Sequence, residues 1–175
     1  MKIVAFAASS SSKSINKKLA AYAAGLLEGS SVDVLDLNDY ELPLFSQDKE
    51  AELGQPGLAK AFLSKLGACD AIVISFAEHN GSYSAAYKNL FDWCSRIMPK
   101  VFQNKPMVLL ATSPGGRGGV GVLTLAINAA PHFDGVVKGN FSLPSFYENF
   151  DVEKNELKNA DLLGQLKVEI EKLKN

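Results

Sequence analysis

Short apolar runs alternate with segments of helical periodicity along this chain, and that alternation constrains its fold more than any other feature. The runs at residues 2–7, 71–76 and 107–111 are continuously apolar, as in strands that are covered on both faces. Residues 31–36 and 136–143 provide two further strands. Strands that alternate with helices in this way form a parallel sheet with helices on both of its faces.

The helical segments follow the expected strands. In the first of them, apolar side chains such as Ile15, Leu19 and Tyr22 recur at helical spacing. We expect helices at residues 15–27, 58–66, 83–97, 120–130 and 163–173, and an irregular, proline-containing loop at residues 38–56. The chain has 175 residues and no internal repeat, so we predict a single domain over residues 1–175. The predicted fold class is α/β, a flavodoxin-like doubly wound five-stranded parallel sheet in the order 2-1-3-4-5.

Composition argues against several classes of protein. Hydrophobic residues make up 47% of the chain, which argues against disorder. The net charge of −1 and the isoelectric point of about 6.1 give no reason to expect a nucleic-acid partner. No apolar run approaches the roughly 18 residues of a membrane span. The first run is also too short for the core of a signal peptide.

The two cysteines, Cys69 and Cys94, form neither a CxxC pair nor a cluster of metal ligands. We therefore expect no metal site, and we interpret both cysteines as buried packing residues. Cysteine usage of this kind favours a reducing, cytoplasmic location.

A serine-rich stretch, AASSSSKSINKKLA at residues 7–20, joins the first strand to the first helix. The stretch does not suit a flexible linker, because a buried strand and a helix flank it closely. It is therefore either a plain turn or a cradle for an anion. We expect Ser14 to be the N-cap of the helix, because its hydroxyl can accept a hydrogen bond from a free N–H group of the first turn.

The charges beside this loop favour the anion cradle. Lys17 and Lys18 occupy the first helical turn, Lys13 lies just upstream, and no acidic residue occurs before Glu28. Acidic side chains are preferred at the positive end of a helix dipole, so this arrangement suits a bound phosphate. The loop has neither GxGxxG nor a Walker lysine motif, which favours a mononucleotide phosphate over a dinucleotide pyrophosphate. A solvated basic turn is the alternative.

Two more loops should lie beside the first, because ligands bind beyond the carboxyl ends of the strands in such sheets. The third strand leads into FAEHNGSYSAAYKNLFDWCS, where Asn80-Gly81 predicts a turn and Ser82 or Ser84 a helix N-cap. Gly81 would let the backbone approach a planar ligand. The fourth strand leads into TSPGGRGGVG at residues 112–121, whose bare N–H groups can bind a polar ring edge. An ordinary turn and a flexible loop are the alternatives.

Together the three loops resemble those of the NAD(P)H-dependent FMN reductases of flavodoxin-like fold, a family that includes quinone, azo-dye and chromate reductases. The family patterns are G-S-x-R-x-x-S-x-N followed by L-A, then P-E-Y-N-G-S followed by L-K-N-x-x-D-W, then S-x-G-G-x-x-G. The matching positions here are Ala8, Ser9, Ser11, Ser14 and Asn16 with residues 19–20, then residues 77–82 and 87–93, then Ser113, Gly115, Gly116 and Gly119. The likeness covers most of the chain, and the second motif is the most specific.

The resemblance implies an FMN-dependent oxidoreductase. Under this hypothesis NADPH or NADH passes a hydride to N5 of the flavin, which then reduces a quinone, a flavin, a nitro or azo compound or a similar acceptor. The first loop would hold the FMN phosphate, the second would flank the ring and the third would contact its pyrimidine edge. The implied cofactor-binding residues are Ser9, Ser11, Ser14, Ile15, Asn16, Ala77, Glu78, His79, Asn80, Gly81, Ser113, Gly115 and Gly116.

We name no catalytic acid or base, since the cofactor carries the chemistry. Glu78 and His79 are expected to line the site or to face solvent. Arg117 could meet a phosphate of the pyridine nucleotide, or it could be an exposed loop arginine.

The sequence departs from the family pattern at three positions. Ser11 stands in place of an arginine, Ala77 in place of a proline and His79 in place of a tyrosine. Lys13 can replace the missing cation only as a point charge, without the two-pronged geometry of arginine. These departures bear on FMN affinity more than on the identity of the ligand.

The partners implied are a small-molecule oxidant and a second copy of the chain, in a homodimer or homotetramer. No nucleic-acid or membrane partner is expected. One predicted helix gives weak support for a second copy, because it carries many large apolar side chains for a surface helix: Phe91, Trp93, Ile97 and Met98. Core packing explains most of them.

Other functions remain as alternatives. The protein could be an FMN-binding electron carrier, or a redox-responsive regulatory protein that does not oxidise NAD(P)H directly. A serine hydrolase is disfavoured because the chain has no G-x-S-x-G elbow. A low-molecular-weight phosphatase is disfavoured because the first loop has no cysteine.

Overall fold

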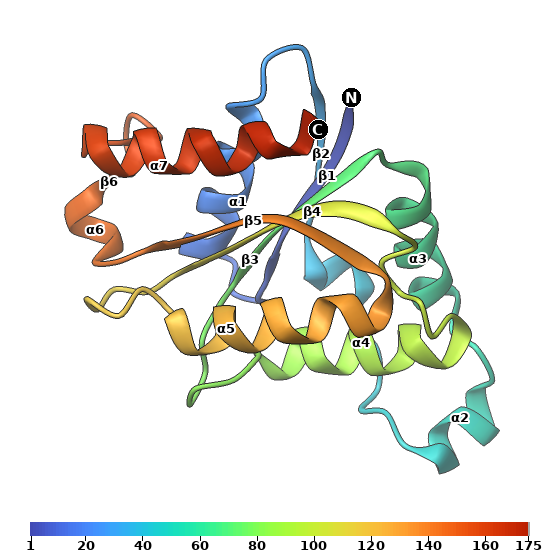
Figure 1. Cartoon of the computed structure of the whole chain (residues 1–175). Coiled ribbons are helices and arrows are strands. Elements are labelled where there is room, and N and C mark those ends of the chain that lie inside the picture. Colours follow the sequence, from blue (N-terminus) through green and yellow to red (C-terminus); the bar gives the residue numbers. More distant parts are fainter. Residues whose placement is uncertain (175) are drawn as a thin grey trace.

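The computed structural model describes residues 1–174 and is built on a parallel sheet (Figure 1). Its strands are β1 (Lys2–Ala8), β2 (Ser31–Leu35), β3 (Ala71–Phe76), β4 (Lys105–Thr112) and β5 (Gly135–Leu143). They lie in the order β2-β1-β3-β4-β5, and every neighbouring pair is parallel. The predicted flavodoxin-like sheet and its strand order are confirmed.

Helices cover both faces of this sheet (Figure 1). The helices α1 (Ile15–Gly25) and α7 (Ala160–Glu171) pack on one face, and α3 (Gly57–Ala68), α4 (Ala85–Ile97) and α5 (Val120–Ala129) pack on the other. Alternate side chains of β1 supply both cores: Val4 and Phe6 face α3 and α4, while Ile3 and Ala5 face α1. Burial on both faces explains why the central strands read as continuous apolar runs.

The segment predicted as an irregular loop contains two helical elements, so that prediction was wrong in part. They are the 3₁₀ helix η1 (Leu37–Tyr40) and the α-helix α2 (Gln47–Leu53). Helix α2 buries none of its residues and projects from the body of the molecule (Figure 1). It has no apolar periodicity to detect. Its local support comes from the Ser46 N-cap, whose hydroxyl accepts from the Lys49 N–H at 3.1 Å.

Short elements after the fourth and fifth strands were also not predicted. They are the 3₁₀ helix η2 (Ala130–Phe133), the helix α6 (Phe146–Asn149), the antiparallel pair β6 (Phe150–Asp151) and β7 (Glu156–Leu157), and the 3₁₀ helix η3 (Lys172–Lys174). Helix α6 and strand β6 are held in place by the burial of Phe146 and Phe150, whose rings stack with centroids 4.8 Å apart. Elements of two to four residues are too short to show a period in the sequence.

Both cysteines are buried and free, as predicted. Burial raises the pKa of the Cys94 thiol to about 12, so this thiol stays protonated at neutral pH. None of the helices within the described part of the chain is long and apolar enough to cross a membrane. The same residues hold no cluster of three or more His, Cys, Asp or Glu side chains that could bind a metal ion.

Candidate functional site

A cavity of about 280 Å³ lies beyond the carboxyl ends of the central strands. Its walls come from the loops after β1, β3 and β4, with one side chain from α6. The predicted site residues that line it are Ser9, Ser11, Ser14, Ile15, Asn16, Ala77, Glu78, His79 and Ser113. Asn80, Gly81, Gly115 and Gly116, which were also predicted, do not line it.

The first loop ends at the N-terminus of α1, where Ser14 is the N-cap, as predicted. Its hydroxyl oxygen accepts from the Lys17 N–H at 3.1 Å. The two preceding helical N–H groups, those of Ile15 and Asn16, have no acceptor among residues 1–174, as is usual in a first helical turn. They point out of the positive end of the helix dipole, beside the cavity that both residues line.

Two buried hydroxyls complete a set of donors around this helix end. The Ser9 oxygen accepts from the Ser11 N–H at 3.2 Å, and Ser9 and Ser14 are only 9% and 8% exposed. Each hydroxyl uses its oxygen as an acceptor, and neither donates its proton to an acceptor in the described chain. The loop therefore presents two O–H and two N–H donors with no protein acceptor, which is the chemistry of an anion site.

Not all of the lysines beside this loop line the cavity. Lys17 forms an ion pair with Asp36, which follows β2, and this hydrogen bond lowers the pKa of the Asp36 carboxyl. Among the three lysines, only Lys13 lines the cavity. Lys17 is thus already paired with a carboxylate distant in sequence, and a contribution of its charge to a phosphate stays a prediction. The sequence near the loop holds no sign of this partner.

Asn16 is held by other parts of the protein. Its side-chain Nδ2 donates to the Thr112 carbonyl at 3.1 Å, and its Oδ1 accepts from the Thr112 N–H at 3.0 Å. The Ser75 hydroxyl donates to the same Oδ1 at 2.7 Å. Asn16 thus ties the start of α1 to the ends of β3 and β4. Both ends of its amide are engaged, so its backbone N–H is the group it presents to the cavity.

The second loop is a tight turn. His79 and Ser82 exchange two backbone hydrogen bonds of 3.0 Å around Asn80 and Gly81, whose φ angles are 51° and 77°. Two successive positive φ angles are typical of an Asn-Gly turn, so the predicted turn is confirmed. No atom lies within 4 Å of the position a Cβ would take at Gly81. Glycine suits the positive φ angle at this position, and its close approach to a planar ligand stays a prediction.

Helix α4 begins directly after this turn, with Ser84 as its N-cap. The Ser84 oxygen accepts from the Tyr87 N–H at 3.3 Å, and its hydroxyl donates to the Ala8 carbonyl at 2.8 Å. Of the two serines proposed as the cap, Ser84 is the correct one. Through Ala8 it also fixes the second loop against the start of the first.

Glu78 makes a contact that sequence analysis did not predict. Its carboxylate accepts from the Val122 N–H at 3.4 Å, in the first turn of α5. Gly119, the N-cap of α5, has no side chain with which to cap the helix and lies in the left-handed region at φ 73°. Glu78 therefore supplies from the second loop the negative group that this helix end lacks, besides lining the cavity.

The third loop is held against the segment that follows β5. The Gly115 carbonyl accepts from the Ser145 N–H, and the Ser113 carbonyl accepts from the Phe146 N–H, both at 3.0 Å. Ser113 lines the cavity, whereas Gly115 and Gly116 are exposed on the outer side of the loop. The predicted role of these two glycines at a ring edge stays a prediction.

Three residues of the cavity wall were not predicted as site residues: Thr112, Pro114 and Tyr147. Tyr147 belongs to α6 and is 61% exposed. A usable signal existed, because the carboxyl end of β5 shares the same edge of the sheet as the three loops that were considered.

The chain has recognisable relatives. The sequence model of the family described as NADPH-dependent FMN reductase matches residues 1–148. An NADPH:quinone oxidoreductase of Arabidopsis thaliana is 32% identical over 132 residues, which cover 73% of this chain and 65% of that protein. An NAD(P)H-dependent FMN reductase of Pseudomonas aeruginosa is 32% identical over 119 residues, covering 67% of this chain and 63% of that protein. The match thus spans slightly less than two thirds of the length of these relatives.

Solved structures share the fold. A flavoenzyme NAD(P)H:(acceptor) oxidoreductase of Paracoccus denitrificans superposes with a TM-score of 0.77 at 22% identity, covering 98% of this chain and 94% of that one. A flavodoxin variant of Pseudomonas aeruginosa superposes with a TM-score of 0.60 at 16% identity, covering 100% of each chain. At these identities the likeness concerns the fold alone.

Proposed function

The chain belongs to the NADPH-dependent FMN reductase family, and on that premise we propose that it oxidises NADPH or NADH and reduces a quinone or a related acceptor, with FMN as its bound cofactor. The names of the relatives support the substrate class. They include a quinone oxidoreductase and an enzyme from a Burkholderia species named 2-hydroxy-1,4-benzoquinone reductase. Flavin, nitro and azo compounds are further acceptors of the same flat shape.

The observation that carries the proposal is the donor set of the first loop. A phosphate brings only acceptor oxygens, and the Ser9 and Ser14 hydroxyls with the Ile15 and Asn16 N–H groups bring only unused donors. Lys13 adds a positive charge beside them. These residues fit the phosphate of FMN without any rearrangement of their own hydrogen bonds.

The remaining walls suit a flat ring. Ala77, His79 and Ser113 line the cavity together with the proposed phosphate donors, and Tyr147 lines it from α6. A bound flavin supplies the redox chemistry, since it accepts a hydride from a nicotinamide and passes electrons to a second substrate. The protein contributes binding, orientation and hydrogen-bond donors, so we assign no acid or base to Glu78 or His79.

An anaerobic absorbance titration tests this function. The protein is loaded with FMN, freed of excess cofactor, and titrated with NADPH and then with NADH. We expect the flavin absorbance band at about 450 nm to bleach with NADPH or NADH and to return on addition of a benzoquinone. Free FMN at the same concentration is the control and should bleach far more slowly.

Two outcomes contradict the proposal. FMN that binds but stays oxidised in the presence of both nucleotides favours an electron carrier or a redox-responsive regulator. A failure to bind FMN at all would mean that the donors of the first loop bind another anion.

We also propose a homodimer or homotetramer in the cytoplasm. Free, buried cysteines suit a reducing compartment. The apolar side chains of α4 support the homodimer or homotetramer less than expected. Trp93 is 1% exposed and packs against Phe45 in the core, which leaves Met98 as the exposed member of that group. Sedimentation as a monomer at micromolar concentration would contradict the assembly.

A further inference from the structure

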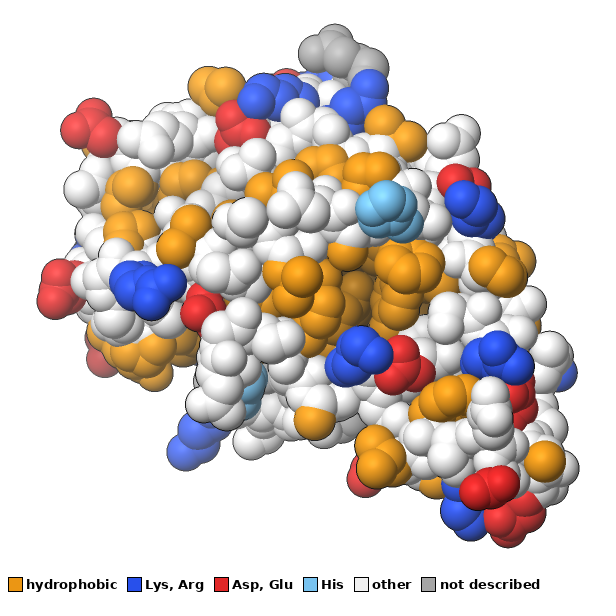
Figure 2. Space-filling model, turned by 60° about the horizontal axis from the view of Figure 1, so that its bottom comes forward, with side chains coloured by type: hydrophobic (Ala, Val, Ile, Leu, Met, Phe, Trp, Pro, Cys, Tyr) orange, Lys and Arg blue, Asp and Glu red, His pale blue; other side chains and the backbone are white. Residues whose placement is uncertain are grey.

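A second cavity lies between α4 and α5. Figure 2 shows hydrophobic side chains gathered around a hollow on this face of the molecule. The cavity has a volume of about 160 Å³ and is lined mostly by aromatic and alanine side chains, among them Phe91, Phe102 and Ala129. Apolar cavities of roughly 150 Å³ bind molecules as small as benzene. This one can therefore hold a single aromatic ring.

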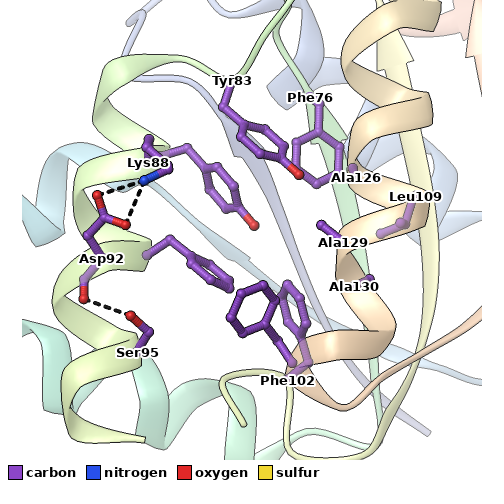
Figure 3. A pocket seen from close by; sticks show the side chains of 13 residues that line it. Phe76, Tyr83, Lys88, Asp92, Ser95, Phe102, Leu109, Ala126, Ala129 and Ala130 are labelled. Carbon is purple, nitrogen blue, oxygen red and sulfur yellow. Dashed lines mark hydrogen bonds and ion pairs between the residues drawn. The ribbon is translucent and has the colours of Figure 1, made fainter. Parts of the chain in front are cut away.

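Two tyrosines line this cavity: Tyr87 of α4, and Tyr83, which precedes the helix and whose side chain points into the cavity (Figure 3). Tyr87 is only 5% exposed, and no hydrogen bond joins its hydroxyl or that of Tyr83 to another residue in the described chain. Within residues 1–174, no fully buried side-chain oxygen lacks a partner. Both hydroxyls therefore face the open space of the cavity rather than apolar protein.

The other polar groups at the cavity are already paired (Figure 3). The Lys88 ammonium forms an ion pair with the Asp92 carboxylate at 2.8 Å, and the Ser95 hydroxyl donates to the Asp92 carbonyl at 2.9 Å. Among the polar side chains that line the cavity, those of the two tyrosines alone form no hydrogen bond to another described residue. An apolar cavity with two such groups matches a ligand that is mostly apolar and polar at one end.

Both hydroxyls are available as hydrogen-bond donors. Burial raises the pKa of Tyr83 to about 12 and that of Tyr87 well above its ordinary value, so both keep their protons at neutral pH. An oxygen of a ligand can accept these hydrogen bonds through its lone pairs.

We propose that this cavity is a second ligand site, which takes a small aromatic molecule carrying one oxygen acceptor, held by the hydroxyls of Tyr83 and Tyr87. The two sites are adjacent along the chain, because Phe76 lines this cavity and Ala77, the next residue, lines the cofactor cavity. The site does not depend on the redox function proposed above, and it can be tested without any turnover.

The test is a ¹⁹F NMR titration of the FMN-loaded protein with 4-fluorophenol, with fluorobenzene as a probe of similar size that lacks the oxygen. We expect saturable binding of both and a preference for the phenol of roughly three- to tenfold, the usual worth of one or two hydrogen bonds. The double variant Tyr83→Phe, Tyr87→Phe should abolish the preference for the phenol, while fluorobenzene should still bind. The double variant should not lower the melting temperature of the ligand-free protein, because the hydroxyls it removes have no partner.

A matched pair of variants locates the site. Ala129→Leu fills the cavity and should weaken both probes at least tenfold. Asn128→Leu introduces the same side chain at the neighbouring exposed position of α5 and should leave both affinities unchanged. Circular dichroism checks that each variant is folded.

Two outcomes overturn the proposal. The first is the absence of saturable binding to the unmodified protein, and the second is binding that Ala129→Leu does not weaken, which places the probe elsewhere. If no probe binds and Ala129→Leu also dissociates a dimer into monomers, the cavity is assigned to contact with a second copy of the chain.

Discussion

Asn16 and Thr112 are bound to each other through two hydrogen bonds, although 96 positions of sequence separate them. One side-chain amide thereby satisfies both backbone groups at the end of β4 and holds the start of α1 beside them. Asn16 is 3% exposed, so water cannot replace either bond.

We expect Asn16→Ala to lower the free energy of unfolding by about 2 kcal/mol, because it leaves buried backbone groups unpaired. It should also weaken FMN binding, since the helix end that carries the donors is no longer anchored. Urea unfolding and a flavin fluorescence titration measure the two effects. Asn128→Ala removes an exposed amide and should change stability by less than about 0.5 kcal/mol. Equal stability of the two variants would contradict the anchoring role.

The serine caps allow a second matched comparison. Ser14 and Ser46 make the same N-cap hydrogen bond, each 3.1 Å long, but Ser46 caps the exposed helix α2. We expect Ser14→Ala to raise the dissociation constant of FMN at least tenfold, because it also removes a free donor from the anion site. Ser46→Ala should leave that constant unchanged. If the two substitutions affect FMN equally, the first loop does not hold the phosphate.

The ion pair between Lys17 and Asp36 makes stability depend on pH. Lys17 holds the pKa of Asp36 below its ordinary value, so the pair stabilises the folded state at neutral pH. That contribution begins to be lost as the pH falls below about 4, the ordinary pKa of an aspartate, and it is gone once the pH is below the lowered pKa of the folded state. We expect the stability difference between the native protein and Asp36→Asn to shrink between pH 6 and pH 3. A difference that stays constant over this range would show that the pair does not act through charge.

Glu78 should act on α5 rather than on the redox chemistry. We expect Glu78→Ala to destabilise the protein by about 1 kcal/mol, since the first turn of α5 loses its capping group. Glu78→Gln keeps an acceptor oxygen and should cost less. The rate of hydrogen exchange at the Val122 N–H measures the local loss of this hydrogen bond. If Glu78→Gln instead abolishes reduction of bound flavin at unchanged stability, the carboxylate has a role in turnover that we did not assign.

The sequence predicts the central sheet well because its strands are buried on both faces. Ile74 and Leu109 must be apolar whichever way their side chains point, so the pattern survives without knowledge of the neighbours. The first loop was recognised for a similar reason, because Ser14 caps the helix that directly follows it. In both cases the physical cause lies within a few residues of the signal.

What could not be predicted depends on partners distant in sequence. The pairing of Lys17 with Asp36 and the contact of Glu78 with α5 both require the sheet to be assembled first. Tyr147 lines the cavity because the segment after β5 is hydrogen-bonded to the third loop through the Ser145 and Phe146 N–H groups. Helix α2 has no apolar face, and so has no periodic signal to detect.

The exposure of α2 has a practical consequence, because it marks a point at which the chain could be divided. A break within Gln47–Leu53 would interrupt no buried residue. The first fragment would carry β1, the serine loop and β2, and the second would carry the loops that build the opposite walls of the proposed cofactor cavity. Neither half alone would carry all the walls of that cavity. The appearance of bound flavin would then report that two separately expressed fragments had found each other.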